Sequence, residues 1–217
     1  MLKIKHFVFS PFLENTYVIW DEENNNAAVV DPGCLSEDEE NQLADFIESE
    51  KLKINYLLNT HCHIDHVFGN AFVKNKYDVP YYAPEKDVFL IDMLPVLSKE
   101  YGIEMKYSPN PGNYITEDTD LKIGNIQIKF LFTPGHTPGE FCLYFEKDKI
   151  CFTGDVLFKE GIGRTDLWGG NYKTLISSIE NKLFSLPDDV KIFPGHGESS
   201  TIGYEKAHNP FLINTLQ

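Results

Sequence analysis

Residues 60–66 read Thr-His-Cys-His-Ile-Asp-His and place three imidazoles and one carboxylate within a very short stretch. The 217-residue chain has only 7 histidines, so chance rarely produces such a cluster, and its spacing favours metal binding over a purely structural role. The apolar run 54–58 predicts a buried strand that ends where the cluster begins. If the backbone stays extended beyond this strand, His61 and His63 point to the same side and can chelate one metal ion.

The second half of this cluster is predicted to face a second ion. Asp65 and His66 lie where we expect the chain to turn into a helix over 66–75, with Asp65 placed like its N-cap. Cys62 alternates with the two histidines and should point away from them. We therefore expect Cys62 to be a packed thiol and not a ligand.

Three more predicted strands end in glycine-containing turns that carry one histidine or aspartate. The strand-like runs cover 130–133, 149–153 and 190–193. The polar residues that follow them are His136, Asp155 and His196. Glycine permits the backbone angles of a tight turn, so a side chain at such a strand end is held by the sheet while it faces a cleft. The sequence therefore predicts a metal site that is assembled from four strand ends.

Four motifs, in their order along the chain, resemble those of the metallo-β-lactamase superfamily of metal-dependent hydrolases. They are THCHIDH (60–66), TPGHTPG (133–139), TGDVLF (153–158) and FPGHG (193–197). The resemblance covers essentially the whole chain. It implies an α+β fold, a four-layer αββα sandwich, formed as a single domain over residues 1–217.

The same resemblance implies a complete set of ligands for two divalent metal ions. The first ion would be held by His61, His63 and His136. The second ion would be held by Asp65, His66 and His196, with Asp155 bridging both. Imidazole and carboxylate donors suit zinc, iron and manganese, and we expect zinc as the usual cofactor.

Further motifs narrow the expected reaction. Residues 153–170 resemble two branches that act on glutathione-type substrates, the glyoxalase II hydrolases and the persulfide dioxygenases. Residues 194–211 and 83–87 resemble the short, second type of bacterial hydroxyacylglutathione hydrolase. Longer glyoxalase II enzymes carry a C-terminal helical domain that binds glutathione, whereas this sequence has 21 residues after His196, so the resemblance leaves glutathione recognition open. Arg164 matches the position of a basic residue that contacts the glutathione moiety; the alternative for it is a salt bridge with Asp166.

The expected activity is hydrolysis of a thioester such as S-lactoylglutathione. Two bridged cations can lower the pKa of a shared water from ~16 toward neutrality and so provide a hydroxide nucleophile. Asp155 would bridge the metals and Asp65 would orient the hydroxide. There are three alternatives. The first is a mononuclear iron persulfide dioxygenase, which uses only the positions of His61, His136 and Asp155 as ligands. The others are a metal-binding protein without catalysis and a β-lactamase. The last is disfavoured by the bridging aspartate.

Composition excludes some partners. The formal net charge is −14, which disfavours nucleic acid, because a phosphate backbone is bound mainly through clustered Lys and Arg. No apolar run approaches the ~18 residues of a membrane span.

We expect a cytoplasmic protein, because the four cysteines form no CxxC pair and no signal peptide precedes Glu14. The sequence carries no sign of its oligomeric state.

The remaining pattern mixes strands and helices. Strands are predicted at 3–9, 16–20 and 27–30, and a β-meander is predicted over 121–132 and 140–145. Helices are predicted at 37–50 and 172–183, the first with Leu43, Phe46 and Ile47 facing inward and with an acidic N-terminus. Sheets covered by helices are compatible with this pattern.

Overall fold

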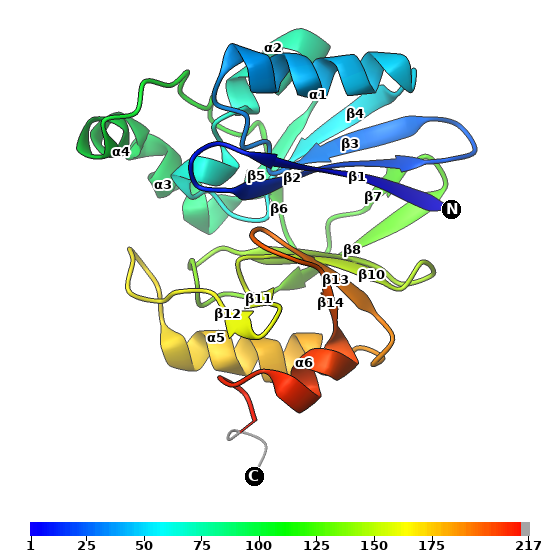
Figure 1. Ribbon diagram of the computed structural model, residues 1–217, viewed down its shortest axis with the longest axis vertical. Helices are drawn as coiled ribbons and strands as arrows, with labels where there is room; N and C mark the ends of the chain where they lie inside the picture. The colour runs from blue at the N-terminus through cyan, green and yellow to red at the C-terminus, as the bar shows by residue number, and fades with distance from the viewer. Residues whose placement is uncertain (214–217) are drawn as a thin grey trace. The chain divides into compact units, whose positions relative to one another are not determined.

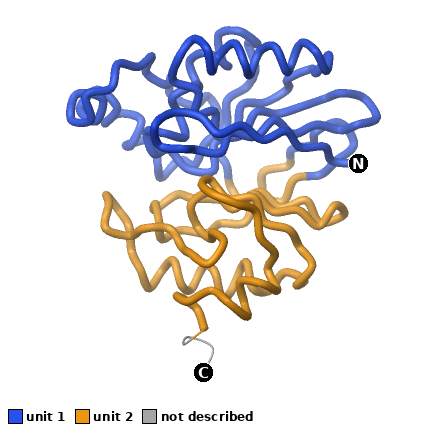
Figure 2. Tube along the Cα trace, in the orientation of Figure 1, with its two compact units in different colours: residues 1–115, 121–127 blue, residues 116–120, 128–217 orange. Residues whose placement is uncertain are grey.

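In the computed structural model, which describes residues 1–213, the chain forms two compact units (Figures 1 and 2). Unit 1 comprises residues 1–115 and 121–127, and unit 2 comprises residues 116–120 and the chain from 128 onward. Each unit contains a β-sheet with helices packed on it. The assignment of residues 1–217 to one domain stays a prediction.

The sheet of unit 1 has the strand order β1-β2-β3-β4-β5-β6. Its strands are β1 (Leu2–Phe9), β2 (Glu14–Asp21), β3 (Asn26–Val30), β4 (Lys53–Leu58), β5 (Tyr81–Pro84) and β6 (Asn113–Ile115). The strands β1 to β3 are antiparallel, whereas β3 to β6 are parallel. The carboxyl ends of β3 and β4 therefore lie at the same edge of the sheet, which is where side chains of a binding site can gather.

The helices of unit 1 are α1 (Glu37–Ser49), α2 (Asn70–Tyr77), α3 (Val88–Asp92) and α4 (Leu94–Tyr101), and α1 and α2 lie on one face of the sheet (Figure 1). The predicted helix at 37–50 is confirmed. It begins with a capping box, in which Ser36 and Glu39 each bond the other's backbone N–H. Leu43 and Ile47 are buried as predicted, and Phe46 packs at the edge of the same core.

The second sheet has the strand order β14-β13-β10-β9-β8-β7, and all of it except β7 and the first residues of β8 belongs to unit 2. Its strands are β8 (Ile126–Phe132), β9 (Phe141–Phe145), β10 (Ile150–Gly154), β13 (Lys191–Pro194) and β14 (Ser200–Thr201). A hairpin of β7 (Leu121–Ile123) with the first residues of β8 belongs to unit 1. Because β9 is antiparallel to β8 and to β10, and β13 is parallel to β10, the strands β8, β10 and β13 all run in one direction.

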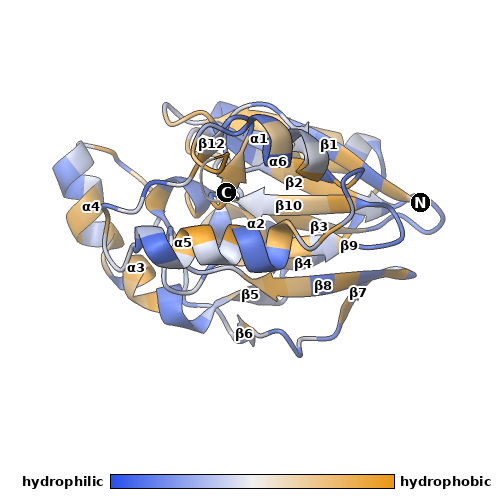
Figure 3. Cartoon of the chain, turned by 90° about the horizontal axis from the view of Figure 1, so that it is seen from below, coloured by the Kyte–Doolittle hydropathy of each residue, from blue (hydrophilic) through white to orange (hydrophobic). Residues whose placement is uncertain are grey.

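Unit 2 also contains a small hairpin and two helices. The hairpin consists of β11 (Leu157–Phe158) and β12 (Gly161–Ile162). The helices are α5 (Tyr172–Ser178) and α6 (Ile202–His208), and a π-helical segment, Ile179–Leu183, continues α5 to the predicted end. Apolar and polar residues alternate along α5 (Figure 3), and its apolar residues join the buried cluster beneath the sheet. Among the described residues, none of the helices combines the length and the apolar character that a membrane crossing requires.

The helix predicted over 66–75 is confirmed for residues 70–75, but its predicted start and Asp65 as its N-cap are wrong. Asp65 lies inside a short 3₁₀ helix, Ile64–His66, and α2 begins only at Asn70. The interruption has a local cause, because the N–H of Gly69 donates to the carbonyl of Pro32 (2.7 Å) and not to a carbonyl of its own segment. A side chain at Gly69 would also meet the Cys34 sulfur at 2.3 Å, so close packing with the 32–34 turn fixes this break.

Candidate functional site

Four of the predicted ligands lie in unit 1, directly after β4. His61, His63, Asp65 and His66 are all buried. The ring centroids of His61 and His63 are 5.0 Å apart, and those of His61 and His66 are 4.0 Å apart. The cluster is therefore compact, and each imidazole has one nitrogen available for a metal if its other nitrogen is engaged elsewhere.

The backbone beyond β3 fixes the orientation of His61. Asp31 follows β3, and its carboxylate accepts hydrogen bonds from the backbone N–H of Thr60 (2.8 Å) and from the hydroxyl of Thr60 (2.6 Å). The hydroxyl has one proton, which it donates to Asp31, so its oxygen accepts from Nδ1 of His61 (3.1 Å). His61 is thereby set as the Nδ1–H tautomer, with Nε2 as its metal-binding atom.

His66 lies beside the same aspartate. Its Nδ1 lies 3.3 Å from Asp31 Oδ2 and 3.9 Å from Glu14 Oε1, while its Nε2 faces Asp65 Oδ2 at 3.9 Å. Carboxylates next to one ring nitrogen retain its proton and raise the basicity of the other, which is how protein metal sites commonly orient histidine ligands. Potential donor atoms of Asp31, His61 and His66 lie within 4.8 Å of one another, so Asp31 is part of the same cluster.

Glu14 is a fully buried acid beside this cluster. Its Oε2 accepts from the hydroxyl of Thr16 (2.7 Å), and its Oε1 accepts no hydrogen bond from residues 1–213. Gly33 makes room for this carboxylate, because a side chain there would meet Oε2 at 2.0 Å. Burial raises the pKa of Glu14 well above 4.5, although the nearby His66 acts in the opposite direction.

This pKa leads to a testable pH dependence in the metal-free protein. Where the unfolded chain has lost the Glu14 proton and the native state keeps it, unfolding releases a proton, so the contribution of Glu14 to stability falls as pH rises above about 4.5. We expect Glu14→Gln to remove this loss, so that the variant gains stability relative to wild type between pH 5 and pH 8 in urea unfolding with chelator present. The exposed Glu48→Gln is the matched control. Parallel pH profiles for wild type and Glu14→Gln would contradict the assignment.

The other three predicted ligands lie in unit 2, after the three strands that run in one direction. His136 follows β8, Asp155 follows β10, and His196 follows β13. Nε2 of His136 lies 3.5 Å from Asp155 Oδ2, and Nε2 of His196 lies 3.6 Å from the same oxygen. One carboxylate oxygen thus sits next to two imidazole nitrogens, which is the arrangement that a bridging ligand requires.

Two contacts fix His136 and Asp155 in place. The carbonyl of Arg164 accepts from Nδ1 of His136 (2.8 Å), which leaves Nε2 as the donor atom for a metal. The backbone N–H of Asp155 donates to Oε1 of Glu140 (2.7 Å), a carboxylate that is fully buried. Both ligands therefore have partners that orient them before any metal binds.

Arg164 makes the salt bridge that was the alternative to a role in substrate binding. Its Nε and one terminal nitrogen contact the two carboxylate oxygens of Asp166, each at 2.7 Å, and both side chains are exposed. The arginine lowers the pKa of Asp166 to about 2. The guanidinium remains at the surface near the His136 loop, and its role in binding substrate stays a prediction.

Cys62 is a packed thiol, as predicted. It is fully buried within the apolar core of unit 1, and burial raises the pKa of its thiol well above 9.0. The other three cysteines are also buried, and none of the four forms a disulfide within the described chain.

Sequence reasoning missed the residues that orient the ligands: Glu14, Asp31, Glu140 and the carbonyl of Arg164. Asp31 had a readable signal, because it follows a predicted strand and precedes Pro32-Gly33, the same pattern that identified the ligands. The glutamates had none, since only tertiary packing distinguishes them from surface acids.

Comparisons with known proteins agree with these features. The family model of the metallo-β-lactamase superfamily matches residues 10–196. The chain is 40% identical over 213 residues to the hydroxyacylglutathione hydrolase GloC of Haemophilus influenzae, with 97% of this chain and 98% of the relative covered. It is 34% identical to a probable metallo-hydrolase of Bacillus subtilis, YqgX, and the alignment covers 97% of this chain and 98% of the relative.

Solved structures are similar over the same length. The B3 metallo-β-lactamase BLEG-1 has a TM-score of 0.88 and 33% identity, with 97% of this chain and 99% of that chain covered. TTHA1623, solved in a di-iron-bound form, has a TM-score of 0.85 and 31% identity, with 96% and 100% covered. The predicted metallo-β-lactamase fold is thereby confirmed, and the chain belongs to the metallo-β-lactamase superfamily.

Proposed function

We propose that this protein is a metal-dependent thioester hydrolase of the hydroxyacylglutathione hydrolase type, which converts S-lactoylglutathione to lactate and glutathione. The observation that carries the proposal is the Asp155 carboxylate oxygen beside the Nε2 atoms of His136 and His196. The 40% identity to a protein named hydroxyacylglutathione hydrolase supports the choice of substrate. The net charge of −14 disfavours nucleic acid as the substrate, which leaves a small molecule as the expected type of substrate.

The predicted ligand set would hold two divalent ions. His61, His63 and His136 would bind one ion, and Asp65, His66 and His196 the other, with Asp155 between them. The donor set fits such ions, because His61, His66 and His136 are all oriented to offer Nε2, and buried carboxylates balance the charge. We propose zinc as the metal, and since TTHA1623 was solved with two irons, metal analysis should count iron as well.

When bound, such a pair of ions supplies a water-derived nucleophile at neutral pH and polarises the thioester carbonyl. The protein's own contribution is positional. Asp65 would accept a hydrogen bond from the attacking water and orient it, while Asp155 would help to hold the ions and balance their charge. The leaving thiolate needs little acid assistance, so no further proton donor is required. The reaction releases a thiol, and the cytoplasmic location that we propose would keep this product reduced.

Arg164 is the candidate for binding a carboxylate of the glutathione moiety. Its exposed guanidinium is already arranged for bidentate contact, as its pairing with Asp166 shows, and it could exchange this partner for a substrate carboxylate. We expect Arg164→Ala to raise KM for S-lactoylglutathione about tenfold, which corresponds to about 1.4 kcal/mol of binding free energy. We expect kcat to change little, because the contact is uniform between ground state and transition state.

Steady-state kinetics would check this expectation, with the surface variant Lys149→Met as the control. Lys149 pairs with Asp189 on unit 2 and has no part in the proposed site. An unchanged KM for Arg164→Ala would reduce Arg164 to the structural salt bridge.

The substrate class is tested by three parallel assays on one purified sample. We expect hydrolysis of S-lactoylglutathione and much slower hydrolysis of a chromogenic cephalosporin. The third assay measures oxygen consumption with glutathione persulfide as the substrate. We expect no oxygen consumption above background. Oxygen consumption without thioester hydrolysis would replace the proposal with an iron persulfide dioxygenase, and cephalosporin turnover alone would replace it with a β-lactamase.

A further inference from the structure

Glu205 of α6 is a fully buried acid that no ligand motif includes. Its Oε2 accepts from the backbone N–H of Glu160 (2.9 Å) and from the side-chain amide of Asn209 (2.8 Å), and the hydroxyl of Ser200 donates to its Oε1. A buried carboxylate is tolerated only when hydrogen bonds replace its water. Three donors from three segments do so here, and they tie α6 to the hairpin of β11 and β12.

The turn of this hairpin needs such an anchor. Glu160 adopts φ 55°, in the left-handed region that non-glycine residues occupy at a cost of about 1 kcal/mol. Its N–H is the one bound by Glu205, and the next carbonyl, that of Gly161, accepts from the amide of Asn209 (3.0 Å). Both backbone contacts come from the C-terminal segment, so α6 determines where the hairpin turns.

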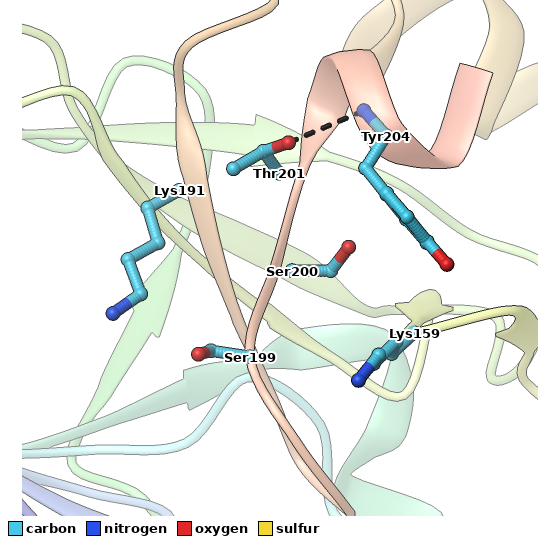
Figure 4. Close-up of a pocket in the computed structure, with 6 residues that line it drawn as sticks. All are labelled: Lys159, Lys191, Ser199, Ser200, Thr201 and Tyr204. Carbon is cyan, nitrogen blue, oxygen red and sulfur yellow. Dashed lines mark hydrogen bonds between the residues drawn. The ribbon is translucent and has the colours of Figure 1, made fainter. Parts of the chain in front are cut away.

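The outer side of the turn has weaker contacts. Lys159 and Tyr204 line a surface pocket with Ser200 (Figure 4), and there they pair with the carboxylates of Glu198 and Glu160. These pairs are exposed to solvent, which screens their interaction. The buried carboxylate of Glu205 is therefore the principal anchor.

After the hairpin the chain reaches Gly163 and Arg164, which lie against His136, a predicted metal ligand. The N–H of Gly163 donates to the carbonyl of Val156 (3.3 Å), and the carbonyl of Arg164 accepts from Nδ1 of His136 (2.8 Å). The fit is close, because a side chain on Gly163 would lie 1.9 Å from the carbonyl oxygen of Asp155 and 3.1 Å from Cβ of His136. A shift of the hairpin must therefore displace the group that sets the tautomer of His136.

We propose that Glu205 is a positioning residue for His136, and that it acts through the β11–β12 hairpin and the carbonyl of Arg164. The inference rests on the proposed metal centre. It gives the C-terminal helix a role in metal binding, although α6 contributes no ligand.

The test compares metal affinity among full-length variants by competition between the protein and a chromogenic zinc chelator. In Glu205→Gln one of the two carboxylate oxygens becomes an NH2 group that cannot accept, so a single oxygen is left for three donors, and we expect zinc affinity to fall about tenfold, the scale for loss of an orienting partner. Asn209→Ala removes the contact to Gly161 and should weaken zinc binding in the same direction. The control is Lys206→Met, which removes the surface pair of α6 with Asp188 and should leave zinc affinity unchanged.

A double-mutant cycle separates positioning from general destabilisation. If Glu205 acts through His136, then Glu205→Gln should have no further effect on zinc affinity in a His136→Ala background. An equal loss in both backgrounds, or wild-type affinity in Glu205→Gln, would overturn the inference. If Glu205→Gln does not fold, the same cycle with Asn209→Ala decides. Wild-type protein that binds no metal would instead overturn the proposed function itself, which is a different result.

Discussion

Asp155→Ala should lose both turnover and metal while the protein remains folded. The carboxylate oxygen beside the imidazoles of His136 and His196 is removed, so the proposed bridge disappears. We expect kcat/KM for S-lactoylglutathione to fall about 10³-fold or more, equivalent to about 4 kcal/mol of transition-state stabilisation. The fold should persist, because the backbone N–H of residue 155 keeps its bond to Glu140.

Two measurements on the same preparations check this expectation: thioester kinetics and metal analysis by mass spectrometry. Asp155→Asn is the matched variant, since it keeps the shape and loses the charge, and it should lie between wild type and Asp155→Ala. Circular dichroism confirms the folded state. Full turnover by a metal-poor Asp155→Ala protein would refute the role of this residue.

Asp31→Ala should destabilise unit 1 and disorder its ligands. Asp31 is almost fully buried and accepts from the backbone and the hydroxyl of Thr60 and from the amide of Asn59, and it also lies beside Nδ1 of His66. Its loss leaves several buried donors without an acceptor. We expect the free energy of unfolding to fall by about 3–5 kcal/mol, the range for breaking a buried charged network, and the metal content to fall with it.

Urea unfolding of the metal-free proteins measures this loss. Asp78→Ala is the control, because Asp78 also has a left-handed backbone (φ 48°, against 46° for Asp31) but an exposed side chain. It should cost no more than about 1 kcal/mol. Equal losses in the two variants would show that backbone conformation, and not the buried network, accounts for the effect of Asp31→Ala.

Much of the fold could be predicted because the strands are strongly apolar and end in recognisable turns. The strands that precede the ligands, β4, β8, β10 and β13, lie within one to four residues of their predicted limits at either end. The motifs stand out because metal binding demands histidine and aspartate at places where folding does not, and the role of these residues as ligands stays a prediction. Their grouping within each unit follows from strands that run in one direction and end at a common edge.

Other parts of the site could not be predicted, for physical reasons. The start of the helix predicted over 66–75 was wrong because the Gly69 N–H bonds to Pro32, a residue distant in sequence. Glu14, Glu140 and Glu205 are buried acids. The chain contains 33 acidic residues, and the sequence does not reveal which of them are buried. The tautomer of His136 depends on a backbone carbonyl, for which side-chain identity carries no signal.

The most direct test of a metal-dependent thioester hydrolase is a metal titration of the chelator-stripped protein. Zinc, and in a parallel series Fe²⁺ under anaerobic conditions, would be added in known ratios to protein while S-lactoylglutathione hydrolysis is followed. We predict that the metal-free protein is inactive and that activity rises with added metal and reaches a plateau at two ions per chain. Hydrolysis by protein that retains no metal, or no hydrolysis at any loading with either metal, would contradict the proposed function.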